Sequence, residues 1–217
     1  MTVRRAERSR PGRPARLGVA GLCAALLGVG GLASCGGGGD NPLGNPPTIN
    51  NPGGSSGQHL SYAYFQRCIY PILIAPLQIN QGGNISTNTC AASGCHDDGA
   101  GTGGAFRVVA GATAVDVTNP ANTPDVIRAT AMYRNFFSAQ GSTLIGSPTQ
   151  SRLLTKPLVL QVLHGGGQIF IDQQDPNARV FQYWISRPVP QGADEFSTAA
   201  YSMFTPADPN TGTCNTQ

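Results

Sequence analysis

Apolar residues recur with the spacing of an α-helix in four segments of the chain. Leu60, Tyr64 and Cys68 lie four residues apart, and Pro71 is expected to end that helix. Thr123 followed by a proline, and later Asp175 followed by a proline, are typical of helix starts. The four expected helices cover residues 60 to about 70, 123–140, 147–156 and 175–187.

The segments between these helices are long and rich in Gly and Asn. Only two short pieces, 106–109 and 168–171, have the apolar character of β-strands. The pattern therefore predicts a mainly α fold: one small helical domain with long Gly/Asn-rich loops. So loose an arrangement needs something besides apolar packing to hold it.

The N-terminal 34 residues are typical of an export signal. Six arginines and one glutamate precede a short apolar stretch that is too short and too rich in glycine to favour a membrane-spanning helix. The stretch ends at 32–35, Leu-Ala-Ser-Cys, which resembles the lipobox of bacterial lipoproteins. The resemblance implies a lipid on Cys35, and Gly36 after it implies sorting to the outer membrane. The alternative is an ordinary secretory signal with a chance cysteine.

Residues 35–58 follow as a segment of Gly, Asn, Pro and Ser with few apolar positions. Such a composition cannot offset the entropy of ordering, so we expect a disordered linker that holds a domain, residues 59–217, away from the membrane. Without residues 1–34 the chain has eight basic and ten acidic residues, a formal charge of −2. This balance gives nucleic-acid binding no electrostatic basis.

The residues with the clearest chemistry are Cys90, Cys95 and His96. Two thiols followed directly by a histidine are the residues that attach a c-type haem, although the usual pattern has two residues between the cysteines and this one has four. Each thiol would add to one haem vinyl group, and His96 would be the proximal iron ligand. Two alternatives remain open: a disulfide between Cys90 and Cys95, and a zinc site.

Several short motifs in the rest of the domain appear in one recognisable order. The motifs are 69–73, Ile-Tyr-Pro-Ile-Leu; 151–157, Ser-Arg-Leu-Leu-Thr-Lys-Pro; 164–167, His-Gly-Gly-Gly; and 181–185, Phe-Gln-Tyr-Trp-Ile. Together with the cysteine motif they resemble the cytochrome-c-like domains of planctomycete and other environmental bacterial proteins. The resemblance covers about 60–187 and implies a cytochrome-c-like fold with one covalent haem c. The wide cysteine spacing and the long insert at 97–122 depart from the family pattern.

The resemblance also implies a position for the second iron ligand. The family commonly has a methionine before the last helix, and this chain has His164 at the matching place. Iron bound by His96 and His164 would have a lower potential than iron bound by histidine and methionine. Met132 is the alternative distal ligand, and a solvated or hydrogen-bonded His164 in a simple turn remains an open interpretation.

Two cysteines remain, Cys68 and Cys214. An oxidising compartment favours a disulfide between them, and this bond would fix the C-terminal tail, 188–217, to the first helix. A Cys68–Cys90 bond is the alternative, and it would remove the haem site.

These observations predict a mono-haem electron carrier of the cell envelope, held on the outer membrane by its lipid and facing the periplasm or the cell surface. Its partners would be envelope redox proteins; no oligomeric state is indicated. The alternative function is a haem-free lipoprotein, stabilised by disulfides, that acts as a binding or structural module. A haem enzyme such as a peroxidase is a third possibility, but no paired carboxylates, Ser-His-Asp set or phosphate loop indicates substrate chemistry.

Overall fold

The computed structural model describes residues 57–217, which belong to one compact unit. The expected signal, the lipid on Cys35 and nearly all of the expected linker lie outside the described residues. None of the helices within 57–217 has the length and apolar character needed to cross a membrane.

The expectation of a mainly α, cytochrome-c-like fold was wrong. The described residues are 33% helix and 11% strand, with two small sheets, and no cytochrome fold is shown. The difference arises in the Gly- and Asn-rich connections, which form a hairpin and irregular loops held by backbone hydrogen bonds instead of linking longer helices.

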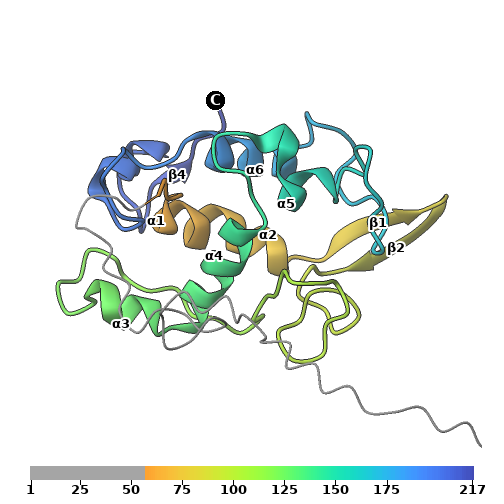
Figure 1. The fold of residues 1–217 in the computed structure, drawn as a ribbon, viewed down its shortest axis with the longest axis horizontal. Coiled ribbons are helices and arrows are strands. Elements are labelled where there is room, and N and C mark those ends of the chain that lie inside the picture. Colours follow the sequence, from red (N-terminus) through yellow and green to blue (C-terminus); the bar gives the residue numbers. More distant parts are fainter. Residues whose placement is uncertain (1–56) are drawn as a thin grey trace, which may run out of the picture. The chain divides into compact units, whose positions relative to one another are not determined.

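The first helical segment runs without interruption from Tyr62 to Ile74 through the middle of the domain (Figure 1). It consists of α1 (Tyr62–Tyr64), the π-helical η1 (Phe65–Ile69) and α2 (Tyr70–Ile74). Pro71 does not end it as predicted. A proline usually clashes with the carbonyl four residues back, which here belongs to Arg67. Arg67 lies in the wider π-helical turn, and that turn accommodates the proline.

The second expected helix is two helices, α3 (Pro124–Arg128) and α4 (Ala131–Gly141). The Thr123 side chain caps α3 as predicted. The break occurs because Thr130 adopts an extended conformation and its hydroxyl accepts a hydrogen bond from the Tyr133 N–H, which starts a new helix.

The last two expected helices are present with changed bounds. A 3₁₀ turn, η2 (Pro148–Gln150), precedes the short α5 (Arg152–Thr155). The final helix, α6 (Pro176–Ser186), begins where Asp175 accepts hydrogen bonds from the N–H groups of Asn177 and Ala178, as the Asp-Pro pair predicts.

A β-hairpin that the apolar pattern did not predict joins α2 to the cysteine motif. Strands β1 (Leu77–Gln81) and β2 (Asn84–Asn88) pair antiparallel across Gly82 and Gly83, whose φ angles are +62° and +97°. The two expected β-like pieces form isolated bridges instead: Val108 pairs with Asp97, and Gln168 pairs with Asn80 of β1. The hairpin and the loop after α5 therefore lie side by side (Figure 1).

The hydrophobic core surrounds the first helical segment. Phe65, Phe136 and Trp184 are fully buried and pack ring against ring, and the Trp184 indole donates a hydrogen bond to the Ser61 carbonyl at 2.9 Å. The C-terminal segment contributes η3 (Thr198–Met203), β3 (Phe204–Thr205) and β4 (Thr213–Cys214). It is tied to η1 by a disulfide between Cys68 and Cys214.

Candidate functional site

The segment from Cys90 to His96 forms a compact turn at the end of β2. The His96 N–H donates to the Cys90 carbonyl at 2.9 Å, and the Cys95 N–H donates to the Ala92 carbonyl at 2.8 Å. Ala91 anchors the turn to α2 by donating to the Leu73 carbonyl at 3.2 Å. The two cysteines and the histidine are therefore held together by local backbone bonds.

The two thiols of this turn are partly buried and are not joined to each other. Burial raises the pKa of the Cys90 thiol to about 11, and the neighbouring Cys95 adds to the rise. Cys95 also lies at the end of the hairpin, since the Asn88 amide donates to its sulfur at 3.9 Å. Neither sulfur is part of a disulfide, as attachment to a vinyl group requires, and the raised pKa keeps Cys90 protonated at neutral pH.

His96 is fixed in position from several sides. Its Nδ1 lies 3.1 Å from the Phe106 carbonyl, its ring packs on the Phe106 ring at 4.8 Å, and its own carbonyl accepts from the Val108 N–H at 2.7 Å. Because Nδ1 donates to a carbonyl, Nε2 keeps the free electron pair that binds a metal. Burial lowers the pKa of His96, and the charges of His164, Arg107 and Lys156 lower it further, against the Phe106 carbonyl.

A glycine allows the insert after the motif to pass close to this imidazole. A Cβ at Gly103 would lie 2.5 Å from both Cε1 and Nδ1 of His96, closer than any real Cβ contact. The Gly103 N–H also donates to the Cys95 carbonyl at 2.7 Å. The 97–122 insert, which departs from the family pattern, therefore covers the motif and supports the histidine.

The structure brings His164 to His96. The two ring centroids are 6.2 Å apart and the ring planes differ by only 12°. His164 lies in the loop after α5, and its Nδ1 is 2.7 Å from the Gly167 carbonyl. Like His96, it therefore uses Nδ1 as a donor and keeps the electron pair on Nε2. Sequence reasoning placed both histidines at one site, and the structure places their rings side by side.

A cavity of about 520 Å³ lies next to His164, between the hairpin turn and the loop after α5. Its lining includes Val159 and Leu163, and the Leu163 side chain is 90% exposed. The other lining residues are polar or glycine, and Cys90, Cys95 and His96 are not among them.

Arg107 follows Phe106 directly and has an unusual terminal nitrogen. Its Nη1 is buried without a hydrogen-bond partner in the described part of the chain, and no carboxylate among residues 57–217 pairs with it. A buried guanidinium nitrogen normally has a hydrogen-bond partner, and the described residues supply none for this atom.

The other site residues from the sequence lie elsewhere. Met132 is on α4, 1% exposed, within the hydrophobic core. Cys68 is joined to Cys214 and not to Cys90. Cys35 lies outside the described residues.

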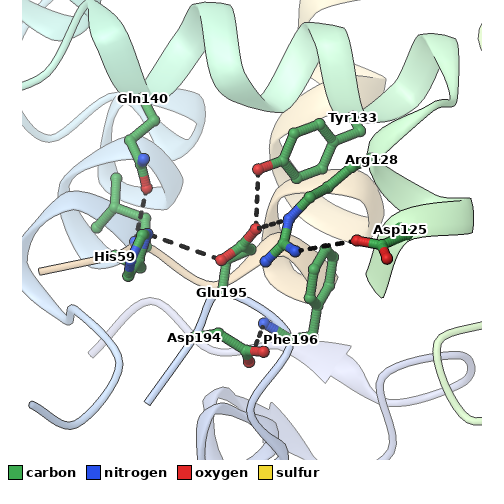
Figure 2. Close-up of polar contacts among 9 residues, drawn as sticks. His59, Asp125, Arg128, Tyr133, Gln140, Asp194, Glu195 and Phe196 are labelled. Atoms are coloured by element: carbon green, nitrogen blue, oxygen red, sulfur yellow. Dashed lines mark hydrogen bonds and ion pairs between the residues drawn. The ribbon is translucent and has the colours of Figure 1, made fainter. Parts of the chain in front are cut away.

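Sequence reasoning missed a second polar cluster, in which Figure 2 shows the Glu195 carboxylate with His59, Arg128 and Tyr133 around it. Glu195 is 3% exposed; it accepts from Arg128 Nε at 3.1 Å and from the Tyr133 hydroxyl at 2.8 Å, and lies 3.7 Å from His59. Burial by itself raises the pKa of Glu195, but hydrogen bonds from its backbone, Arg128 and Tyr133 outweigh burial and lower it. The cluster joins the C-terminal segment to the helices. The sequence gave no signal for this cluster, because Glu195 simply follows a Gly-Ala-Asp turn.

No group of three or more His, Cys, Asp or Glu residues within 57–217 is arranged to hold a bare metal ion. Haem needs fewer side chains, since the porphyrin supplies four of the six iron ligands. Comparison of the chain with family models, curated proteins and solved structures gives no match.

Proposed function

We propose that this protein is a mono-haem c-type cytochrome that carries electrons in the cell envelope. In this proposal Cys90 and Cys95 bind the haem covalently, and His96 and His164 are its axial ligands. The proposal concerns the site and does not require the mainly α fold that the sequence suggested. A lipid on Cys35 and an outer-membrane location belong to it and rest on residues 1–36 of the sequence.

The observation that carries the proposal is the spacing of the two imidazoles. A histidine nitrogen lies about 2 Å from a bound metal, and the ring centre lies about 1 Å farther away. Two histidines on opposite sides of one metal therefore have ring centres about 6 Å apart. The centroids of His96 and His164 are 6.2 Å apart. The two Nδ1 hydrogen bonds to carbonyls support the same role, since each leaves Nε2 available.

The remaining residues of the site fit the same cofactor. Val159 and Leu163 place two apolar side chains beside His164, and the unpaired Nη1 of Arg107 suits a propionate carboxylate. When bound, haem supplies a one-electron iron couple. Cys90 and Cys95 would hold that group and His96 and His164 would bind its iron, and two protein ligands on the iron would favour electron transfer over substrate binding.

The first test is covalent attachment. The full-length protein, produced with the cytochrome c maturation machinery, should be red and keep its haem in denaturing electrophoresis. The peptide that contains Cys90 and Cys95 should carry the mass of one haem. A C90A/C95A variant should be colourless, whereas Cys68→Ser should stay red. A disulfide between Cys90 and Cys95 in the mature protein would contradict the proposal and favour the haem-free module.

The second test is the axial pair. Ferric protein should be low-spin, and His164→Ala should convert it to high-spin while the haem stays attached. His59→Ala is the matched control, because His59 lies at the Glu195 cluster and should leave the spectrum unchanged. High-spin iron in the unmodified protein would contradict the two-histidine assignment and indicate an open site, as in a peroxidase.

A further inference from the structure

The loop that carries His164 is attached to the β1–β2 hairpin. Asn80 of β1 and Gln168 exchange two backbone hydrogen bonds, of 2.8 and 2.9 Å. The Gln81 amide adds a bond to the Gly165 carbonyl at 3.3 Å. The loop therefore forms an isolated β-bridge with the hairpin at Gln168, the residue directly after Gly167.

Gly167 links this β-bridge to the His164 imidazole. Its N–H donates to the His164 carbonyl at 2.8 Å, and its carbonyl accepts from His164 Nδ1 at 2.7 Å. The orientation of the ring thus depends on the position of the Gly167 peptide.

Only glycine fits at position 167. Its φ angle is +82°, and a Cβ there would lie 2.7 Å from the Asn80 carbonyl oxygen and 2.7 Å from Gln81 Cγ. The first of these neighbours is backbone of a paired strand and cannot move aside easily.

Before His164 the loop offers the histidine little support, whereas after it Phe170 is buried and the N–H groups of Ile169 and Phe170 donate to the Pro157 carbonyl at 2.8 and 3.2 Å. Val159 and Gln161 have φ angles of +54° and +55°, which residues other than glycine rarely adopt, and Leu163 is 90% exposed. His96, in contrast, is held within its own turn and by Phe106. Among the described residues, the hairpin therefore supports the loop directly beside the Gly167 peptide that binds His164, and Pro157 and the core hold the loop farther along.

We propose that the close contact of Gly167 with Asn80 positions His164 opposite His96, so that the β1–β2 hairpin sets the axial pair. This inference rests on the proposed function and assigns positioning roles to Gly167 and the hairpin. The same hairpin ends at Asn88, which contacts the Cys95 sulfur. One element thus holds the cysteine motif at its end and the distal histidine near its turn.

The test compares Gly167→Ala with Gly165→Ala in the full-length haem protein. The two substitutions add the same methyl group two positions apart, but a Cβ at Gly165 meets nothing within 4 Å and its φ is not positive. Loss of an outer contact of a metal-bound histidine typically weakens binding about 10- to 100-fold. We expect the ratio of low-spin to high-spin ferric iron to fall about tenfold or more in Gly167→Ala, and less than about twofold in Gly165→Ala.

A second variant guards against simple misfolding. Gly83→Ala strains the hairpin turn, where φ is +97°, without meeting any atom within 4 Å. It should shift the spin state in the same direction by a smaller factor. Low-spin spectra in Gly167→Ala equal to those of the unmodified protein, or equal losses in Gly165→Ala and Gly167→Ala, would overturn the inference.

A readout without haem separates this inference from the proposed function. Amide hydrogen exchange at Asn80 and Gln168 should speed up about tenfold or more in Gly167→Ala and stay nearly unchanged in Gly165→Ala. If the protein attaches no haem but shows this exchange pattern, the positioning role of Gly167 holds and the proposed cytochrome function is wrong. If haem is attached but exchange in Gly167→Ala is unchanged, the positioning role of Gly167 is wrong and the proposed function stands.

Discussion

The buried carboxylate of Glu195 gives a stability prediction whose size follows from the structure. Glu195→Gln keeps the shape of the side chain and removes its charge. The carboxylate accepts two charge-assisted hydrogen bonds, from Arg128 Nε and the Tyr133 hydroxyl, while only 3% exposed. Bonds of this kind contribute about 1.5 to 3 kcal/mol each, and a neutral amide oxygen keeps part of each bond. Arg128 is 41% exposed, so water stabilises part of its unpaired charge. We expect a loss of about 2 kcal/mol at pH 7.

The effect should depend on pH with a definite sign. The pKa of Glu195 is lowered in the folded protein, so ionisation stabilises the fold above the unfolded value of about 4.5, and this contribution is lost as the pH falls through the folded pKa. Urea unfolding of the two proteins at pH 7 and at pH 3 should therefore show a difference that shrinks in acid.

Asp125→Asn is the control, because Asp125 contacts the same Arg128 at 3.7 Å but is 97% exposed. Its unfolding midpoint should match that of the unmodified protein. A pH-independent loss in Glu195→Gln, or an equal loss in Asp125→Asn, would refute the reasoning.

Three further outcomes are expected. Cys68→Ser opens a disulfide that spans 146 residues and should lower stability by about 5 kcal/mol in the chain-entropy model, as denaturant unfolding would show. Gly103→Ala places a methyl group 2.5 Å from the His96 ring and should reduce low-spin haem in the ferric spectrum, whereas Gly99→Ala, with only an ordinary contact at 3.5 Å, should not. In the haem protein that we propose, Arg107→Gln should lower the midpoint potential by about 50 mV, because a cation near the haem would favour the reduced state; spectroelectrochemistry measures the shift.

The helix starts could be predicted from the sequence because their causes are local. Thr123 and Asp175 cap the helices that follow them, as their side chains and the adjacent prolines indicate. The break at Thr130 was missed because a threonine within an apolar pattern is compatible with either a continued helix or a cap. Pro71 was misinterpreted because the π-helical turn before it depends on packing around the core, which no local pattern shows.

The hairpin was missed although a signal was present. Gly82 and Gly83 stand between two five-residue segments, and a glycine pair at that spacing is typical of a two-residue hairpin turn. The polar residues of both strands concealed it, because β2 is exposed along its whole length and has no apolar face to reveal a period of two.

The candidate site divides in the same way. Cys90, Cys95 and His96 could be identified because they lie close together in the sequence. The partners that orient the two imidazoles are the carbonyls of Phe106 and Gly167. Backbone carbonyls are present at every residue, so the sequence could not indicate which of them would face a histidine.

The two histidines also differ in how much of the chain must be folded before each is in place. His96 obtains its main contacts within 90–108, whereas His164 depends on the pairing of Asn80 with Gln168. Under the proposed function, haem attachment at the cysteine motif would need only a short stretch of chain, and binding of His164 to the iron would come later, when distant segments meet. In refolding experiments the change in the haem spectrum when His164 binds would then report when the hairpin and the loop after α5 come together.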